Sequence, residues 1–150
     1  MEQKETLTEE QLSLKLFIVL SRALESVRKQ VVKDIKRYNL NLSEFAVLEL
    51  LYHKGEQPIQ MIGKKVLLAS SSITYVVDKL EEKGLLERNA CPNDRRVIHG
   101  HLTEKGKQLM EEIFPQHEKA MAYIFSSLSN EEKEQAIDLL KRVGLFAEKL

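Results

Sequence analysis

Residues 58–103 read PIQMIGKKVLLASSSITYVVDKLEEKGLLERNACPNDRRVIHGHLT, and they predict two helices followed by a two-stranded ribbon. The first helix begins at Pro58, which suits a first helical position, and apolar residues repeat at helical spacing from Ile59 to Val66. A turn at residues 67–69 precedes the second helix, which Ser70 or Ser71 can cap. The buried stripe of this second helix is formed by Ile73, Val76, Val77 and Leu80.

Two glycines indicate how these helices pack and end. Gly63 lies inside the first helix, where glycine costs about 1 kcal/mol relative to alanine, so we expect the second helix to approach its backbone closely. Gly84 follows the second helix and can adopt the left-handed conformation that ends a helix, with Leu85 as the hydrophobic contact beyond it. Strands are then expected at residues 85–88 and 97–102, on either side of a loop at residues 90–94. This order of elements predicts a winged helix-turn-helix, in which one helix enters a DNA major groove.

Three motifs in this region, together with their spacing, resemble the signature of the MarR family of bacterial transcriptional regulators. They are LEEKGLLER at residues 80–88, NDRR at residues 93–96 and LTEKG at residues 102–106. The flanking segments are similar to the family's helices in order and length, so the resemblance covers nearly the whole chain. It implies a mostly α fold with a small β-wing (α+β), in which long N- and C-terminal helices from two subunits interlock into a homodimer.

Length and composition place limits on the class of protein. The 150 residues are expected to form one domain, and 43% of them are hydrophobic. No apolar run reaches the ~18 residues of a membrane span, and the polar, acidic N-terminus predicts neither a secretory nor a mitochondrial leader. A single cysteine fits a reducing cytoplasm. The formal net charge of zero is unusual for a DNA-binding protein, so the basic residues must be unevenly distributed. The candidates for a local basic face are Lys64, Lys65, Lys79, Arg88, Arg95 and Arg96.

Long amphipathic helices are expected on both sides of the winged unit. Thr8 and Gln11 form a capping box at the start of a helix that runs to residue 38, and its apolar stripe is too long to be buried within so small a subunit. We therefore expect part of it to pack against a partner; the alternative is a long core helix in a monomer. Ser43 is expected to cap the next helix, Thr103 a helix kinked at Pro115, and Ser129 the last helix. The expected organisation is a single domain over residues 1–150, with a DNA-binding unit at residues 43–103 and dimerisation helices at residues 8–38 and 103–150.

The candidate DNA-binding residues form two groups. Hydroxyl groups and one lysine on the second helix can bond phosphates and some base edges, and they belong to Ser70, Ser71, Ser72, Thr74, Tyr75 and Lys79. Asp94, Arg95 and Arg96 lie at the tip of the ribbon, where adjacent arginines suit phosphate contact or insertion into a narrow minor groove. The family resemblance implies this role for Arg96, with Asp94 orienting it; a solvated charged turn is the alternative.

The ribbon also contains residues that could carry metal or redox chemistry. His99 and His101 share one strand face and can bind zinc, but two histidines are not a complete ligand set, so structural histidines are favoured and no metal is predicted. Gly100 lies where the family usually has an apolar residue, which predicts a loosely packed or bent strand. Cys91 is a candidate redox residue because neighbouring arginines would favour its thiolate, although an inert loop cysteine is the favoured interpretation.

The sequence contains no common catalytic, metal-binding or phosphate-binding motif, so neither an enzyme nor a cofactor is expected. It predicts a DNA-binding transcriptional regulator, most simply a cytoplasmic repressor that binds a pseudo-palindromic operator in double-stranded DNA. The resemblance implies release by a small effector, often aromatic or phenolic, bound between the dimerisation helices and the DNA-binding unit. Residues 44–55 and 69–79 are similar to the quinone- and hydroquinone-responsive branch. The alternative is a winged-helix module that binds protein instead of DNA, which a salt-dependent affinity for duplex DNA would exclude.

Overall fold

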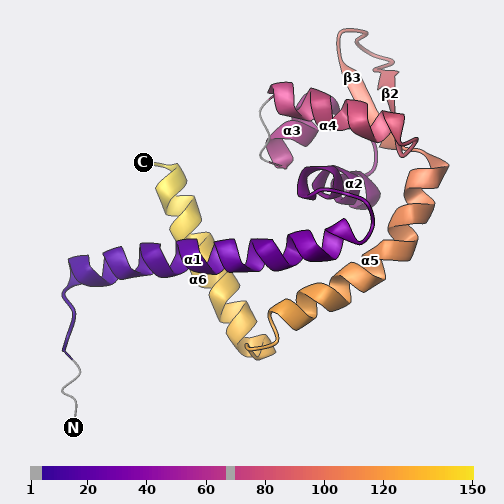
Figure 1. Ribbon diagram of the computed structural model, residues 1–150. Helices are drawn as coiled ribbons and strands as arrows, with labels where there is room; N and C mark the ends of the chain where they lie inside the picture. Colours follow the sequence, from indigo (N-terminus) through magenta and orange to yellow (C-terminus); the bar gives the residue numbers. More distant parts are fainter. Residues whose placement is uncertain (1–4, 67–69) are drawn as a thin grey trace.

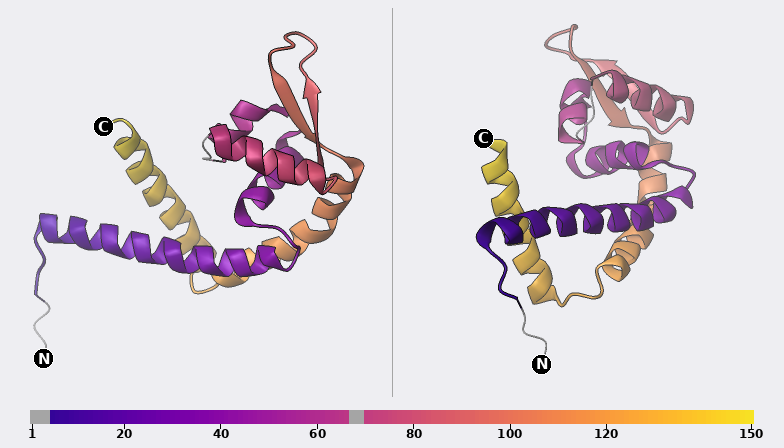
Figure 2. Two further views of the ribbon diagram at one scale, coloured as in Figure 1. Left: turned by 45° about the horizontal axis from the view of Figure 1, so that its top comes forward. Right: turned by 60° about the vertical axis from the view of Figure 1, so that its left-hand side comes forward.

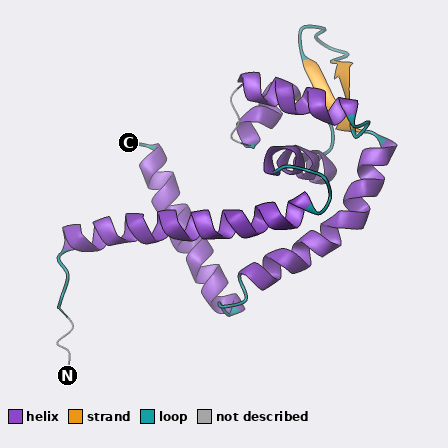
Figure 3. Ribbon diagram, in the orientation of Figure 1, coloured by secondary structure: helices purple, strands orange, loops and turns teal. Residues whose placement is uncertain are grey.

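A computed structural model describes residues 5–66 and 70–150, and it confirms a mostly α fold with a small antiparallel sheet (Figure 1). The helices are α1 (Glu9–Lys36), α2 (Leu42–Lys54), α3 (Ile59–Lys65), α4 (Ser70–Glu82), α5 (Glu104–Ile124) and α6 (Asn130–Glu148). The strands are β1 (Gln57–Pro58), β2 (Leu86–Ala90) and β3 (Ile98–Leu102). Helices α2, α3 and α4 gather with the sheet into one lobe, from which the long helices extend (Figure 3).

The sheet has the order β1-β3-β2, with both pairings antiparallel. Strand β1 was not predicted, because two residues are too short to show a periodicity, and Pro58 consequently precedes α3 instead of starting it. Strand β2 begins one residue and ends two residues nearer the tip than predicted, whereas β3 begins one residue farther from the tip than predicted. Strand β3 pairs with β2 in an unbroken register from Ile98 to Leu102, so the buried Gly100 does not interrupt the strand.

The two glycine predictions are confirmed. A Cβ on Gly63 would lie 3.1 Å from Cγ2 of Ile73, so the absence of a side chain allows α3 and α4 to pack closely. Gly84 has φ of +73°, and the N–H groups of Gly84 and Leu85 donate to the carbonyls of Glu81 and Leu80 at 2.8 and 3.0 Å. These two bonds satisfy the last carbonyls of α4 and turn the chain directly into β2. The expected turn at 67–69 lies outside the described residues.

Helix capping follows the sequence at three of the four predicted sites that the structure describes; the start of α4, where Ser70 or Ser71 was expected to cap, adjoins residues outside the described part of the chain. Thr8, Thr103 and Ser129 cap α1, α5 and α6 as predicted, but α2 is capped by Asn41 and not by Ser43. Oδ1 of Asn41 accepts from the N–H of Glu44 at 2.8 Å, and Oε1 of Glu44 accepts from the N–H of Asn41 at 3.1 Å. This capping box begins the helix two residues earlier, which places Ser43 inside its first turn.

The core of the lobe is closed from below by α1 and α5. Its fully buried side chains come from five helices and β2, and they include Ile35, Leu48, Ile62, Ile73, Leu80, Leu86 and Met110. Helix α5 changes direction along its length (Figure 1), as expected for a helix that contains Pro115.

The remainder of α1 and the whole of α6 extend away from this core (Figure 2). Helix α6 has no buried residue, and α1 buries only Asp34 and Ile35, near its C-terminus. Large apolar side chains are nevertheless exposed along both helices, including Leu14, Phe17 and Phe146 at 67%, 71% and 68%. None of the helices in the described part of the chain is both long enough and apolar enough to cross a membrane.

Candidate DNA-binding surface

Helix α4 presents a polar face to solvent on the outside of the lobe. Ser72, Thr74 and Tyr75 are exposed, and Lys79 is half-buried beside them. The Lys79 ammonium lies 5.4 Å from the centre of the Tyr75 ring and 3.4 Å from a carboxylate oxygen of Glu82. The side chains of Ser70 and Ser71 lie outside the described residues. The face therefore offers hydroxyl groups and one cation, the types of group that bond DNA phosphates and base edges.

The tip of the β2–β3 hairpin carries the candidate charged residues of the wing. The Arg96 side chain is 92% exposed, and its Nε donates to Oδ1 of Asp94 at 3.2 Å. The same oxygen accepts from the backbone N–H of Arg96 at 3.0 Å, so Asp94 shapes the turn and also contacts the guanidinium. Arg95 is exposed, whereas Cys91 is half-buried and donates its backbone N–H to the carbonyl of Val97 at 2.8 Å. Because the Asp94–Arg96 pair is solvated, it positions a charge without adding much stability.

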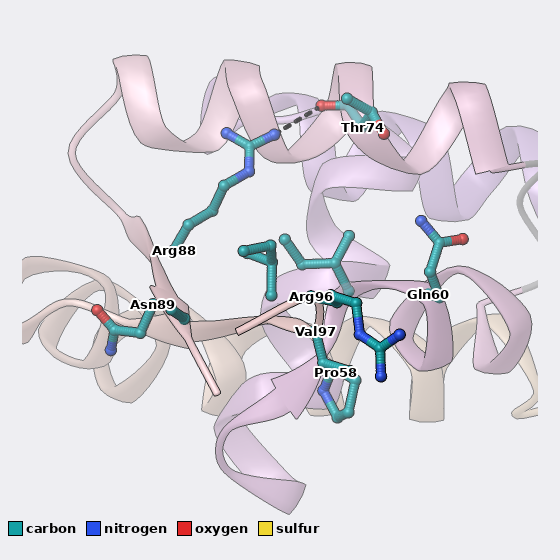
Figure 4. A pocket seen from close by; sticks show the side chains of 10 residues that line it. Pro58, Gln60, Thr74, Arg88, Asn89, Arg96 and Val97 are labelled. Carbon is teal, nitrogen blue, oxygen red and sulfur yellow. Dashed lines mark hydrogen bonds between the residues drawn. The ribbon is translucent and has the colours of Figure 1, made fainter. Parts of the chain in front are cut away.

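A cleft of about 500 Å³ separates α4 from the wing (Figure 4). Its walls come from the start of α3, from α4 and from both ribbon strands: Pro58, Ile59, Gln60, Thr74, Arg88, Asn89, Ala90, Arg96, Val97 and Ile98. Figure 4 shows Arg88 reaching from β2 toward α4. Two of the candidate residues, Thr74 of the helix and Arg96 of the wing, thus border one depression, although they are about twenty positions apart in the sequence.

Arg88 has a different role from the one predicted. Its guanidinium lies 2.6 Å from a carboxylate oxygen of Asp78 and 2.8 Å from one of Glu81, and it approaches the carbonyl of Thr74 at 3.4 Å. Burial lowers the pKa of Arg88, but the hydrogen bonds to Asp78 and Glu81 outweigh that effect and hold the pKa above its ordinary value. The expectation that Arg88 contributes to a basic face is therefore wrong, because two carboxylates of α4 neutralise its charge. Nothing local in the sequence indicates which arginine pairs with which acid.

The outer face of the sheet holds a polar cluster away from α4. Nδ1 of His99 and Nδ1 of His101 each lie 3.8 Å from Glu56, and Nε2 of His101 lies 3.3 Å from Glu87. Asn89 also contacts Nδ1 of His101 at 3.0 Å. Within residues 5–66 and 70–150, no group of three histidine, cysteine or acidic side chains is arranged to hold a metal ion.

Buried polar contacts, which were not predicted, join the lobe to the long helices. Nδ1 of His117 on α5 lies 2.9 Å from Oδ2 of Asp34 on α1, and the His117 ring lies 4.5 Å from that of Phe45 on α2. Nearby, the Lys83 ammonium lies 2.7 Å from Oε2 of the buried Glu44 and forms an ion pair with it. The angle at which the two groups meet is not that of a hydrogen bond. Lys83 also donates to the carbonyl of Asn39 at 2.9 Å. These contacts connect the end of α4 with the junction of α1, α2 and α5.

Comparisons with known proteins agree with this arrangement. The model of the MarR family matches residues 40–98. The HTH-type transcriptional regulator MhqR of Bacillus subtilis is 59% identical over 135 residues, which cover 90% of this chain and 93% of MhqR. The solved structure of CouR from Rhodococcus jostii, bound to p-coumaroyl-CoA, superposes with a TM-score of 0.77 at 28% identity over 88% of this chain and 93% of CouR. BpsR of Bordetella bronchiseptica, from a study of the regulation of its DNA binding by 6-hydroxynicotinic acid, has a TM-score of 0.78 at 25% identity over 87% and 98% of the two chains.

Proposed function

The chain belongs to the MarR family of transcriptional regulators, and we propose that it is a cytoplasmic repressor that binds a pseudo-palindromic operator as a homodimer. A small aromatic effector releases it from the operator. The observation that carries this proposal is that α4 and the wing lie on the same lobe with a cleft between them. A recognition helix in the major groove and a hairpin tip in the flanking minor groove require this arrangement.

Each half of the surface suits a different kind of DNA contact. The hydroxyls of Thr74 and Tyr75 and the ammonium of Lys79 can bond phosphates and some base edges from within the major groove. Arg96, almost fully exposed at the hairpin tip, suits a narrow A·T-rich minor groove, whose negative potential attracts arginine. Since no arginine lies on the described face of α4, we expect direct readout to be modest and DNA shape to contribute strongly.

The exposed apolar surface of α1 and α6 supports the homodimer. Apolar surface at Leu14, Phe17 and Phe146 is not covered within the protomer, and extended exposed patches of this kind mark interfaces. Removing residues 131–150 should therefore abolish the dimer. A truncated protein that remained folded, monomeric and fully able to bind DNA would refute this assembly. A two-fold dimer also predicts two half-sites about one helical turn, ~10 bp, apart.

The effector is proposed to bind where the lobe meets the long helices. Aromatic rings already gather there: the Phe114 ring lies 4.7 Å from that of His53 and 5.9 Å from that of Tyr52. The buried His117–Asp34 pair adjoins this cluster and can exchange hydrogen bonds with a hydroxylated ring. Two relatives are described with aromatic ligands, CouR with p-coumaroyl-CoA and BpsR with 6-hydroxynicotinic acid. The narrower proposal, from the resemblance of residues 44–55 and 69–79, is a phenolic or quinone-like effector.

The proposed function is tested in two steps. Binding sites are first selected from random duplex DNA, and the affinity for the selected duplex is then measured by fluorescence anisotropy over a salt series. We expect affinity to fall linearly with salt on logarithmic axes, because each phosphate contact releases counterions. We also expect a hydroxylated aromatic compound to release the duplex. If no duplex is selected and affinity does not depend on salt, the protein is instead a winged-helix module that binds another protein.

A further inference from the structure

One side chain joins the recognition helix to the wing. Arg88 belongs to β2, yet its guanidinium lies against three residues of α4, at Thr74, Asp78 and Glu81. These positions are spaced by four and three residues, so they lie along the single face of α4 that looks toward the ribbon. The guanidinium is planar and presents its donors in a fixed fork, which suits two carboxylates at once.

Within this contact the arginine is less exposed to solvent than the two acids that it bonds. The Arg88 side chain is 28% exposed, whereas those of Asp78 and Glu81 are 53% and 36% exposed. Bonds of this geometry, made by a partly buried arginine to two partners, are worth more than an isolated surface ion pair. A single β2 side chain therefore restrains the ribbon relative to α4 at about mid-strand, between the buried Leu86 and the solvated tip.

We propose that Arg88 is a positioning residue for DNA recognition: it sets the distance and angle between α4 and the wing, and so determines where Arg96 meets the flanking minor groove. This inference rests on the proposed DNA-binding function. Arg88 is not itself a DNA ligand, because its guanidinium is already engaged by Asp78 and Glu81. DNA phosphates would also have to approach past those two carboxylates.

A second explanation of the same contact must be separated from this one. Asp78 is exposed, and without Arg88 its carboxylate would repel the DNA backbone, so Arg88 could act merely by neutralising it. The two explanations differ in one respect. If Arg88 only neutralises Asp78 and Glu81, replacing those acids makes Arg88 unnecessary. If Arg88 positions the wing, replacing the acids does not restore the position.

The test uses the full-length protein and operator duplexes with either A·T or G·C flanks. Arg88→Ala should weaken binding to the A·T-flanked operator by about fivefold or more and remove the preference for A·T flanks, as Arg96→Ala should. In the Arg96→Ala background, Arg88→Ala should have little further effect, because both changes remove the same contact. Arg88→Lys retains the charge but cannot bridge both acids, so its loss should be intermediate. Glu87→Gln, on the opposite face of β2 beside His101 and outside the cleft, is the matched control and should retain the flank preference.

Two further measurements decide between the explanations. In Arg88→Met combined with Asp78→Asn and Glu81→Gln, the flank preference should remain lost although the repulsion has been removed. Wild-type behaviour of this triple variant would overturn the proposal in favour of simple neutralisation. In the free protein, the amide of Cys91, bonded to Val97 in the wing, should exchange its hydrogen faster in Arg88→Ala than in wild type.

The possible failures are distinguishable. If Arg96→Ala and Lys79→Ala weaken binding but Arg88→Ala does not, the DNA-binding function stands and the positioning role is wrong. Unchanged amide exchange at Cys91 in Arg88→Ala would also refute the restraint of the wing. If the wild-type protein binds no duplex, the proposed function and this inference are both wrong.

Discussion

The glycine in the motif at residues 102–106 packs against the base of the wing so closely that a methyl group cannot be accommodated. A Cβ on Gly106 would lie 2.2 Å from the carbonyl oxygen of Leu85, and real Cβ contacts are essentially never shorter than 3.0 Å. The atom it would meet belongs to the backbone, so no rotamer change can relieve the overlap. The same carbonyl accepts from the N–H of Thr103 at 3.1 Å, so any shift that makes room also strains this bond.

The expected loss of stability from Gly106→Ala follows from three contributions. Overpacking costs about 1–3 kcal/mol, and loss of the Thr103 hydrogen bond costs about 1 kcal/mol. Better helix propensity of alanine in α5 offsets about 1 kcal/mol. The net effect is about 2 kcal/mol, a substantial part of the 5–15 kcal/mol typical of a folded domain.

Urea unfolding followed by far-UV circular dichroism at one protein concentration measures this loss. With a slope of roughly 2 kcal/mol per M, the midpoint for Gly106→Ala should fall by about 1 M. Gly100→Ala is the matched control, because its Cβ would make ordinary contacts of 3.4–3.9 Å with Ile62, Ile59 and Leu86. That variant should be neutral or gain about 0.5–1 kcal/mol. Equal midpoints for Gly106→Ala and wild type would refute the steric argument.

Four further predictions concern function and assembly. Arg96→Ala should cost about 1–3 kcal/mol of operator affinity and relax the A·T flank preference, whereas Lys79→Ala should weaken binding equally for all sequences and reduce the slope of log affinity against log salt by about one. Anisotropy titrations that showed wild-type flank preference in Arg96→Ala would contradict the wing's role. Cys91→Ser should bind DNA normally and be released by a quinone as readily as wild type, and release of wild type alone would show that the thiol is the sensor. A methyl group added at Gly144 in α6 would have no neighbour within 4 Å, so in the protomer alone alanine should stabilise the helix by about 1 kcal/mol. If a partner helix packs closely at this glycine in the proposed dimer, Gly144→Ala should instead weaken the dimer in sedimentation. The pKa of Glu132 is lowered chiefly by the hydrogen bond from the backbone N–H of Ser129, so its stabilisation of α6 is present above the ordinary glutamate pKa and is lost as the pH falls through the lowered pKa. Thermal unfolding of Glu132→Gln should lack this pH dependence.

The features that could be predicted from the sequence are those encoded by short segments. Thr8 and Gln11 form a capping box because both partners lie within one helical turn, and the same holds for Ser129 and Glu132. Gly84 ends α4 because only glycine adopts its backbone conformation without strain.

Features that depend on distant partners were missed or misassigned. Asp34 and His117 are 83 residues apart, and no periodicity of either helix indicates that they meet. The charge of Arg88 was misassigned because the acids that neutralise it belong to another element. The two residues of β1 form a strand by pairing with β3, which no local pattern indicates. At α2, two polar residues could each cap the helix, and the choice of Asn41 over Ser43 depended on the reciprocal bond from Glu44.

The most direct test of the central claim is the dependence of affinity on half-site spacing. An insertion of five base pairs between the half-sites of a selected operator moves one of them by about half a helical turn, onto the opposite face of the duplex. If a rigid homodimer reads both half-sites with α4 and the wing, affinity should fall by about tenfold or more, toward that of a single half-site, and an insertion of ten base pairs should recover only part of it. Equal affinity for the original and the five-base-pair-shifted operators would contradict two-fold recognition of DNA by this protein.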